Sequence, residues 1–353
     1  MSTSDGEAES AWADLSSEFD RSTRTHRSIL TERFYVFGGG VARIRVVGLA
    51  LADLFDRPFA HLRLENQPIQ EPDLKIDLVD ASETGIPCKL RSSPLVRGHM
   101  SSSADGHLLV QERESIKSAF DRREGRIVSL VADAAFLPLS EHSSPLHLML
   151  LLWHRDRGLP MAHAGLVAID GSAVLLGGPG GAGKSTVSLC CLLDGFSYLS
   201  DDYVALEALT DGTFVGHGLY ATARVVPDHL KRFPQLHSQA LKGTRPEEDK
   251  NVVQLAAHFS NQLKSSARIR ALVLPRVCDG QETIIRPATK TEALLRLAPS
   301  SVLQLPLGKS GRDSFDHLAR MIESVPTFWM ELGPDLGEIP KRVRGILAEA
   351  STV

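Results

Sequence analysis

The sequence predicts an α/β protein with two domains, and three observations support this. A length of 353 residues is enough for two domains of ordinary size. The first half contains short runs in which apolar and polar residues alternate, as in half-buried strands. The second half alternates apolar strand-like runs with segments of helical spacing. We therefore expect a disordered tail at 1–28, a smaller mixed α/β domain at 29–144 and a larger α/β domain at 145–353.

The expected smaller domain consists mainly of strands. Alternation predicts strands at 34–37, 42–47 and 74–80, with further strands within 107–132. The three glycines at 38–40 lie between two strand runs and lack the G-x-x-G helix entry of a dinucleotide site, so they indicate a hairpin turn. No residue pattern in this domain indicates a particular chemistry.

Composition restricts the class of protein. Apolar residues make up 42% and charged residues 23%, with a net charge of −4, so no basic excess favours nucleic acid as a partner. The run LHLMLLLW (146–153) is shorter than the roughly 20 residues of a membrane span and predicts a buried helix. The polar, acidic N-terminus does not resemble a signal peptide. Four cysteines without a C-x-x-C pair indicate reduced thiols. We expect a cytoplasmic protein without membrane partners.

The larger domain carries a strand, a glycine-rich loop and a helix in immediate succession. The apolar run 173–176 predicts a buried strand, and 186–193 predicts a helix that ends at Asp194-Gly195. A strand follows at 196–206. The polar segment 227–250, with its prolines, predicts a loop or lid. Later elements are expected as strands at 269–277, 282–288 and 328–332, as helices at 290–298 and 313–325, and as a closing helix.

The loop between the predicted strand and helix matches G-x-x-x-x-G-K-[ST] from Gly178 to Ser185. Glycines let successive backbone N–H groups point at phosphate oxygens, and the helix N-terminus adds a favourable field. Lys184 would reach the β- and γ-phosphates of ATP, and Ser185 would bind Mg²⁺. The expected nucleotide-binding residues are Gly178, Pro179, Gly180, Gly181, Ala182, Gly183, Lys184, Ser185 and Thr186.

Two adjacent carboxylates, Asp201 and Asp202, follow soon after this helix. Adjacent strand residues face opposite ways, so the two need not have the same role, although a backbone turn would bring both to the phosphates. One can bind Mg²⁺ with Ser185 while the other accepts a proton from an attacking hydroxyl. A solvated Asp-Asp turn at a strand end is the alternative interpretation.

The segment AHAGLVAIDGSAVLLGGPGGAGKSTVSLCCLLDGFSYLSDDYVALE resembles the core of the HPr kinase/phosphorylase family. Three landmarks match in order, namely His163, the loop at 178–185 and Asp201-Asp202. The resemblance is strong over 158–208 and weaker over 265–345. It implies a C-terminal P-loop core like that of HPr kinase and phosphoenolpyruvate carboxykinase.

The resemblance also implies site roles. Asp201 would be the general base toward a serine hydroxyl, Asp202 would bind the divalent metal with Ser185, and His163 would lie beside the phosphates or the base. Taken alone, His163 is also compatible with a core histidine in an apolar strand. The stretch VGHGLYATARVVPDHL departs from the family signature, which argues against HPr itself as substrate. The pattern resembles most the kinases that phosphorylate lasso-peptide precursors.

Other side chains are weaker candidates. Arg224 could balance charge on the transferred phosphoryl group or could be a surface arginine, and Lys250 could act similarly from the lid. His217 is expected to be incidental. The remaining groups lack a metal or hydrolase pattern: His142, His147, His154 and Ser144.

These observations predict an ATP- and Mg²⁺-dependent kinase that phosphorylates a serine of a protein or peptide, with a lasso-peptide precursor as one candidate. A small-molecule kinase of carboxykinase-like fold and a non-catalytic nucleotide-binding regulator remain as alternatives. Homo-oligomerisation, nucleotide preference and a reverse phosphorylase activity are left open by the sequence.

Overall fold

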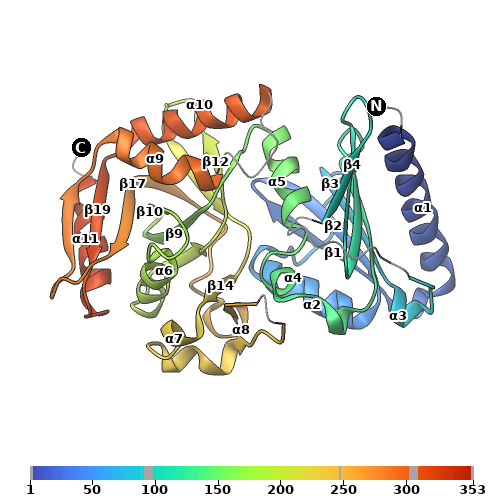
Figure 1. Cartoon of the computed structure of the whole chain (residues 1–353), viewed down its shortest axis with the longest axis horizontal. Helices are drawn as coiled ribbons and strands as arrows, with labels where there is room; N and C mark the ends of the chain where they lie inside the picture. The colour runs from blue at the N-terminus through green and yellow to red at the C-terminus, as the bar shows by residue number, and fades with distance from the viewer. Residues whose placement is uncertain (1–2, 89, 91–97, 246–247, 302–308, 351–353) are drawn as a thin grey trace. The chain divides into compact units, whose positions relative to one another are not determined.

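The computed structural model describes residues 3–88, 90, 98–245, 248–301 and 309–350. The chain divides into two compact units, Met1–Trp153 and His154–Val353. Each combines helices with a mixed sheet, in agreement with the predicted α/β class (Figure 1). The boundary lies within helix α5, His147–Asp156, rather than at residue 144. This helix is largely buried, as the apolar run predicted.

The first unit contains a sheet of seven described strands in the order β1-β2-β3-β7-β6-β5-β4. Strands β2, β3 and β7 run parallel, and the remaining neighbours pair antiparallel. Gly38 and Gly39 have positive φ and close the β1–β2 hairpin, as predicted. The strands are β1 Leu30–Phe37, β2 Gly40–Val47, β3 Leu74–Asp80, β4 His99–Ser102, β5 Leu108–Arg113, β6 Ile116–Asp121 and β7 Arg126–Val131.

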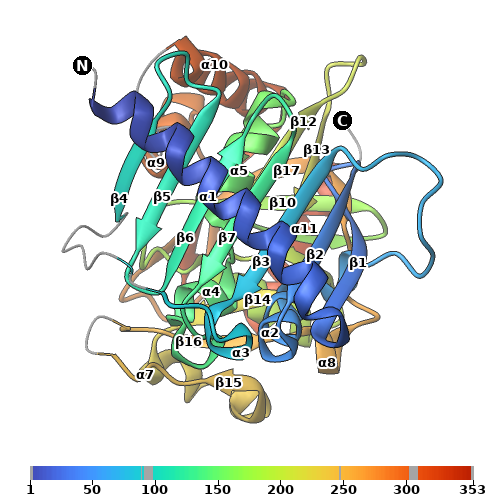
Figure 2. The same ribbon diagram turned by 90° about the vertical axis from the view of Figure 1, so that its right-hand side faces the viewer.

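A long helix, α1 (Thr3–Thr25), occupies most of the segment for which a disordered tail was predicted. It crosses one face of this sheet (Figure 2). Its buried residues are spaced three or four apart, and they pack against Val47, Val79 and neighbouring strand residues. The polar composition of the segment concealed this narrow apolar stripe, formed by Ala8, Ala11, Leu15 and Phe19.

Smaller helices complete the first unit. Helix α2 packs against β1 and β2. The helices are α2 Leu49–Phe59, α3 Ala81–Thr84 and α4 Leu139–Ser143, with 3₁₀ turns η1 Arg27–Ile29, η2 Ala60–Leu62 and η3 Ala134–Phe136.

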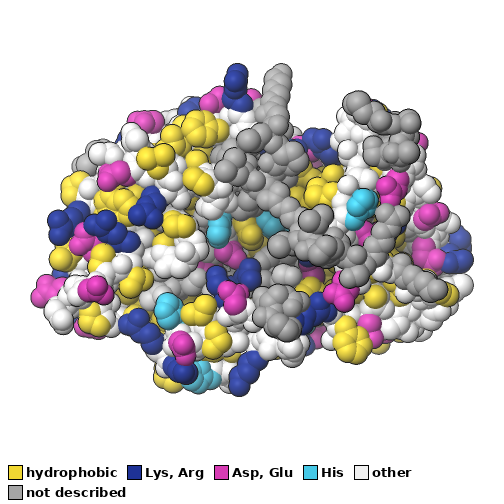
Figure 3. Space-filling view, in the orientation of Figure 1, with side chains coloured by type: hydrophobic (Ala, Val, Ile, Leu, Met, Phe, Trp, Pro, Cys, Tyr) yellow, Lys and Arg dark blue, Asp and Glu magenta, His cyan; other side chains and the backbone are white. Residues whose placement is uncertain are grey.

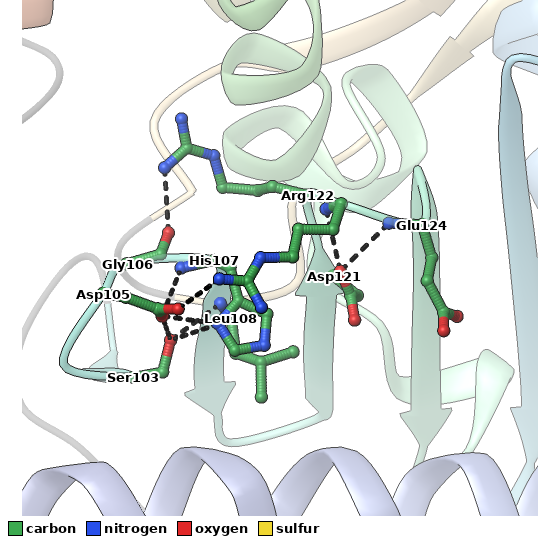
Figure 4. Close-up of polar contacts among 9 residues, drawn as sticks. Ser103, Asp105, Gly106, His107, Leu108, Asp121, Arg122 and Glu124 are labelled. Carbon is green, nitrogen blue, oxygen red and sulfur yellow. Dashed lines mark hydrogen bonds and ion pairs between the residues drawn. The ribbon is translucent and has the colours of Figure 1, made fainter.

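Two neighbouring turns of the first unit are joined by hydrogen bonds (Figure 4). In the β4–β5 turn, Oδ1 of Asp105 accepts from the Ser103 hydroxyl at 2.8 Å and lies 2.5 Å from Nδ1 of His107. In the β6–β7 turn, Oδ1 of Asp121 accepts from the backbone N–H of Glu124 at 3.1 Å. Nη1 of Arg122 donates to the Gly106 carbonyl at 2.9 Å. The Ser103 hydroxyl also lies 3.1 Å from Nδ1 of His107, the same ring nitrogen that contacts Asp105. The imidazole therefore does not bridge the serine and the aspartate through its two nitrogens, so this cluster closes a turn and is not a hydrolase triad.

The second unit is built on a larger mixed sheet. Its described strands follow the order β11-β9-β10-β17-β13-β12-β8, with β19 beside β17 and β18 beside β19. The strands are β8 Met161–Ala162, β9 Ala164–Ile169, β10 Ser172–Gly177, β11 Ser197–Ser200, β12 Val204–Ala208, β13 Phe214–Gly218, β17 Ser266–Val277, β18 Ile284–Pro287 and β19 Thr327–Leu332. A second sheet pairs β14 Thr222–Val225, β16 Asn251–Gln254 and β15 Ala240–Leu241.

Helices cover both faces of this larger sheet because β10 buries alternate residues on opposite sides. Val174 and Leu176 pack toward α6 (Lys184–Leu193) and α11 (Glu338–Ala350). Ala173 and Leu175 pack toward α9 (Lys290–Ser301) and α10 (Lys309–Ser324). The predicted strand, loop and helix are therefore confirmed as elements, together with the later strands and helices.

Two expectations for this unit were wrong. The segment 196–206 is not one strand: it forms β11 and β12 with a break at Asp201–Tyr203, and β11 pairs with β9. The segment 227–250, predicted as a loop or lid, is not wholly irregular, because it contains α7 (Pro227–Leu230), the 3₁₀ helix η4 (Pro234–Gln239) and β15. Residues 246–247 of it lie outside the described residues.

Neither the hydropathy of the helices nor the distribution of surface charge indicates a particular function. Across the described residues, none of the helices is both long and apolar enough to cross a membrane. On the face drawn in Figure 3, basic and acidic side chains are interspersed.

Candidate functional site

The loop between β10 and α6 depends on glycine. Gly178, Gly181 and Gly183 have φ angles of 145°, 81° and 106°, which side-chain-bearing residues rarely adopt. A Cβ atom on Gly183 would also lie 2.4 Å from Cδ1 of Leu332. No side chain makes a capping hydrogen bond to the backbone N–H groups at the N-terminus of α6. This geometry suits the binding of an anion.

A cavity of about 110 Å³ lies over this loop. It contains most of the site residues predicted from the sequence, but Gly178 and Asp201 are not part of its lining. It also contains residues that the sequence did not single out, of which His229 carries a titratable side chain. The lining comprises His163, residues 179–186, Asp202, Arg224, Val225, Val226, His229 and Lys250.

Lys184 is 7% exposed and its ammonium folds back onto the loop. Nζ donates to the Gly178 carbonyl at 2.7 Å and to the Pro179 carbonyl at 3.3 Å. Burial lowers the pKa of Lys184, nearby Lys250 lowers it further, and the Asp202 and Asp201 carboxylates oppose this. A bound phosphate would offer this cation oxygen acceptors of opposite charge.

The two aspartates lie in the turn between β11 and β12. Oγ of Ser200 donates to the Tyr203 carbonyl at 2.7 Å and accepts from the Tyr203 N–H at 3.1 Å, which closes the turn. The Asp202 carbonyl accepts from the Ala164 N–H at 3.1 Å. The turn is therefore tied to the first residue of β9, directly after His163. His163 was predicted within a strand, but it lies in the break between β8 and β9.

Asp202 lies in the cavity and contacts His163. Its side chain is 25% exposed, and Oδ1 lies 2.9 Å from Nε2 of His163. Oδ2 lies 3.9 Å from Nη1 of Arg224. Burial alone would raise the pKa of Asp202, but the hydrogen bond and charge of His163, and then Arg224 and Lys184, hold that pKa below its usual range. Asp202 is therefore ionised at neutral pH.

Asp201 is 3% exposed and has a different environment. Oδ2 accepts from the Arg224 N–H at 3.2 Å. Burial and the Asp202 charge raise the pKa of Asp201 to about 6, against the effects of the Arg224 N–H, the Ser185 hydroxyl and Lys184. Oδ1 is buried and receives no hydrogen bond of regular geometry from the described residues. One oxygen of this carboxylate is thus available near Ser185.

These residues fit Mg²⁺, which prefers oxygen ligands. The hydroxyl of Ser185, Oδ1 of Asp201 and the Asp202 carboxylate are the oxygen donors near the loop. In the described part of the chain, no group of three or more His, Cys, Asp and Glu residues could hold a metal ion by itself. An ion here would therefore complete its shell with phosphate and water oxygens, as is usual for Mg²⁺.

The weaker candidates fall in different places. Arg224 and Lys250 line the cavity, because β14 pairs with β16 and brings Val225 opposite Asn251. Only the pairing of these strands, which are distant in sequence, could have revealed Val225, Val226 and His229. His217 is not in the lining and bonds Glu207 at 2.7 Å on the neighbouring strand.

The chain matches no protein-family model and no curated protein sequence. Among solved structures, it is similar to the Hpr(Ser) kinase/phosphatase from Coxiella burnetii, with a TM-score of 0.31 and 12% sequence identity. The match covers 54% of this chain and 90% of that one. A similarity of this size does not identify an activity.

Proposed function

We propose that this protein is an ATP-dependent kinase that transfers the γ-phosphoryl group to a serine hydroxyl of a peptide or protein. The observation that carries the proposal is that one cavity contains both a glycine-rich phosphate loop and an ionised carboxylate bonded to His163. A protein that only binds nucleotide has no need of the second feature. The serine and the peptide come from the resemblance in sequence, which also makes a lasso-peptide precursor one candidate acceptor.

The loop and its surroundings would hold the nucleotide. The backbone N–H groups of 178–186, the N-terminus of α6 and Lys184 would bind the phosphates. Ser185 and Asp201 would hold Mg²⁺, which neutralises charge on the phosphates when bound. Arg224 and Lys250, which line the cavity, would balance the charge on the transferred group.

The geometry favours exchanging the roles that the resemblance implies for the two aspartates. Asp202 lines the cavity and contacts His163, so its carboxylate lies where an acceptor hydroxyl could reach it, which suits a general base. Asp201 is outside the lining and lies near Ser185, which suits a metal ligand. In transfer, the serine oxygen forms a bond to the γ-phosphorus and its proton passes to Asp202. The bond from the γ-phosphorus to the bridging oxygen breaks and ADP leaves, while His163 stabilises the Asp202 carboxyl group.

Two conservative substitutions test both the activity and the exchange. Asp202→Asn should lower transfer to a serine-containing peptide by roughly 10²–10⁴-fold while ATP affinity changes little. Asp201→Asn should instead weaken the Mg²⁺-dependent part of ATP binding. Transfer would be followed with radiolabelled ATP and binding by calorimetry, with Asp211→Asn, an exposed aspartate of the same unit, as the control.

Other outcomes point elsewhere. If Asp201→Asn abolishes transfer with normal Mg²⁺·ATP affinity, Asp201 is the general base, as the resemblance implies. If the wild type binds ATP but transfers nothing to peptides or to small hydroxylated acceptors, the protein is a regulator. Transfer to a small acceptor alone would identify a small-molecule kinase.

A further inference from the structure

A row of three cations crosses neighbouring strands of the first unit. Arg43 on β2 is in register with Lys75 on β3, and Lys75 is in register with Arg126 on β7. Because strand side chains alternate, Arg45 lies on the same face one pair along, in register with Asp77. Like charges directly opposite in a sheet destabilise it unless other groups compensate.

The carboxylates of the protein compensate this row only in part. Asp77 is fully buried and accepts from Nε of Arg45 at 2.8 Å and from Nε of Arg126 at 2.8 Å. The ion pairs of the other two cations, Arg43 and Lys75, are longer, and their carboxylates are more exposed. Arg43 lies 3.7 Å from Glu32, which is 42% exposed, and Lys75 lies 3.9 Å from Glu71, which is 89% exposed. Such pairs contribute little.

Arg43 has a further unmet requirement. Its Nε is buried and makes no hydrogen bond to any described residue. Burial and the neighbouring Arg45 lower the pKa of Arg43, against the opposing effects of the Asp77, Glu32 and Glu71 carboxylates.

A cavity of about 480 Å³ opens over this row. Four cations and two carboxylates line it, namely Asp20, Arg43, Arg45, Lys75, Glu124 and Arg126. This volume is within the range of small-molecule sites. Aromatic rings of α1 hold two of the guanidinium groups, since Arg45 lies 4.7 Å from the Phe19 ring centroid and Arg126 lies 5.8 Å from that of Trp12.

We propose that this cavity binds a phosphate monoester group. Guanidinium groups bind phosphate in a bidentate manner, and the two negative charges of the ligand would supply what Asp77 does not. Asp20 and Glu124 would accept hydrogen bonds from donor groups next to the phosphate, and they would repel a polyanion. The same chemistry is present in a phosphoserine peptide and in a free sugar or glycerol phosphate. The proposal does not depend on the kinase activity.

Calorimetry on the full chain tests this site. Lys184→Gln serves as the background, so that phosphate binding at the loop is weakened. The probes are Gly-phosphoserine-Gly, glycerol 3-phosphate and inorganic phosphate. Adding Arg43→Gln and Lys75→Gln should lower affinity for the best probe by about tenfold or more. The charge-matched control adds Arg24→Gln and Arg57→Gln, two exposed arginines of the same unit, and should leave the affinity unchanged.

A second readout separates a binding site from a structural ion-pair network. Without phosphate, the Arg43→Gln/Lys75→Gln variant should melt at the same temperature as its parent or higher, because repulsion is removed. The proposal is overturned if no probe binds the background protein, if the control loses the same affinity, or if the double variant melts clearly lower without phosphate. Preference for the peptide or for glycerol phosphate identifies the source of the group, and equal binding indicates that the phosphate alone is recognised.

Discussion

The two proposed phosphate sites of this protein are built by opposite means. In 154–353, a glycine-rich loop with one buried lysine lines the cavity, and these residues are contiguous in sequence. In 1–153, the lining residues come from a helix, three strands and a turn, and they span positions 20 to 126. The first site depends on backbone conformation, whereas the second depends on strand register and on a buried counter-ion.

This difference determines how substitutions should affect each site. Dipoles of N–H groups are fixed by the fold and need no compensating charge when phosphate is absent. A row of cations repels itself, so it requires Asp77 as a permanent partner. Loss of the counter-ion Asp77 should therefore destabilise the first unit, whereas the site in the second unit should be sensitive to substitutions that disturb the backbone of the loop.

Asp77→Ala should have the largest effect on stability. It leaves Arg45 and Arg126 without their buried acceptor, which we expect to cost about 3–5 kcal/mol. The melting temperature of the first unit should fall by roughly 6–20 °C. Differential scanning calorimetry checks this against Asp53→Ala, since Asp53 is an exposed partner of Arg57 and should matter little. Equal effects of the two variants would mean that Asp77 does not hold the row.

Local sequence signals predicted the loop site but not the sheet site. An apolar run, a glycine motif and a helix follow one another in the chain, so β10, the loop and α6 could be located directly. Arg43, Lys75 and Arg126 become neighbours only through the parallel pairing of β2, β3 and β7. Alternation identified these strands without their order in the sheet.

The same limit applies within the loop site. The sequence brought His163 and Asp202 into one hypothesis, but their contact depends on two strand breaks and on the turn tied to Ala164. Sequence spacing could not distinguish Asp201 from Asp202, because the turn replaces the continuous strand that was predicted. Environment distinguishes them: one carboxylate is buried beside Ser185 and the other lines the cavity.

Gly183→Ala should have the next largest effect, and it tests the backbone basis of the loop site. Alanine at a φ of 106° is strained, and its Cβ would meet Leu332. We expect a loss of about 2–3 kcal/mol, or roughly 4–12 °C in the melting temperature of the second unit. Gly180→Ala is the matched control, because φ there is not positive and a Cβ would have no neighbour within 4 Å. Similar melting of the two variants would refute this account of the loop.

Lys184→Gln should weaken ATP binding without large destabilisation. The loss of one charge-assisted contact to phosphate should lower affinity by roughly 10–100-fold. Calorimetry with Mg²⁺·ATP measures this, and Lys231→Gln, an exposed lysine paired with Asp228, is the control. Unchanged affinity in Lys184→Gln would show that the loop does not bind the nucleotide phosphates.

The smallest effect concerns pH and the first unit alone. His61 has a buried Nδ1 that lacks a hydrogen-bond partner among the described residues, and burial lowers its pKa from 6.5 to about 4. Below pH 6.5 the unfolded chain therefore binds a proton that the folded chain does not. The contribution of His61 to stability is complete above pH 6.5 and declines as the pH falls toward 4.

Between pH 6.5 and 5.5 the loss should be at most about 1 kcal/mol, or roughly 2–4 °C. In His61→Gln this part of the pH dependence should disappear from the melting transition of the first unit. The second unit serves as the internal control, because its transition should shift equally with pH in the wild type and the variant. A first-unit transition with the same pH dependence in both proteins would show that His61 is not held neutral. The pH dependence of the first unit's stability would then come from its other titratable groups.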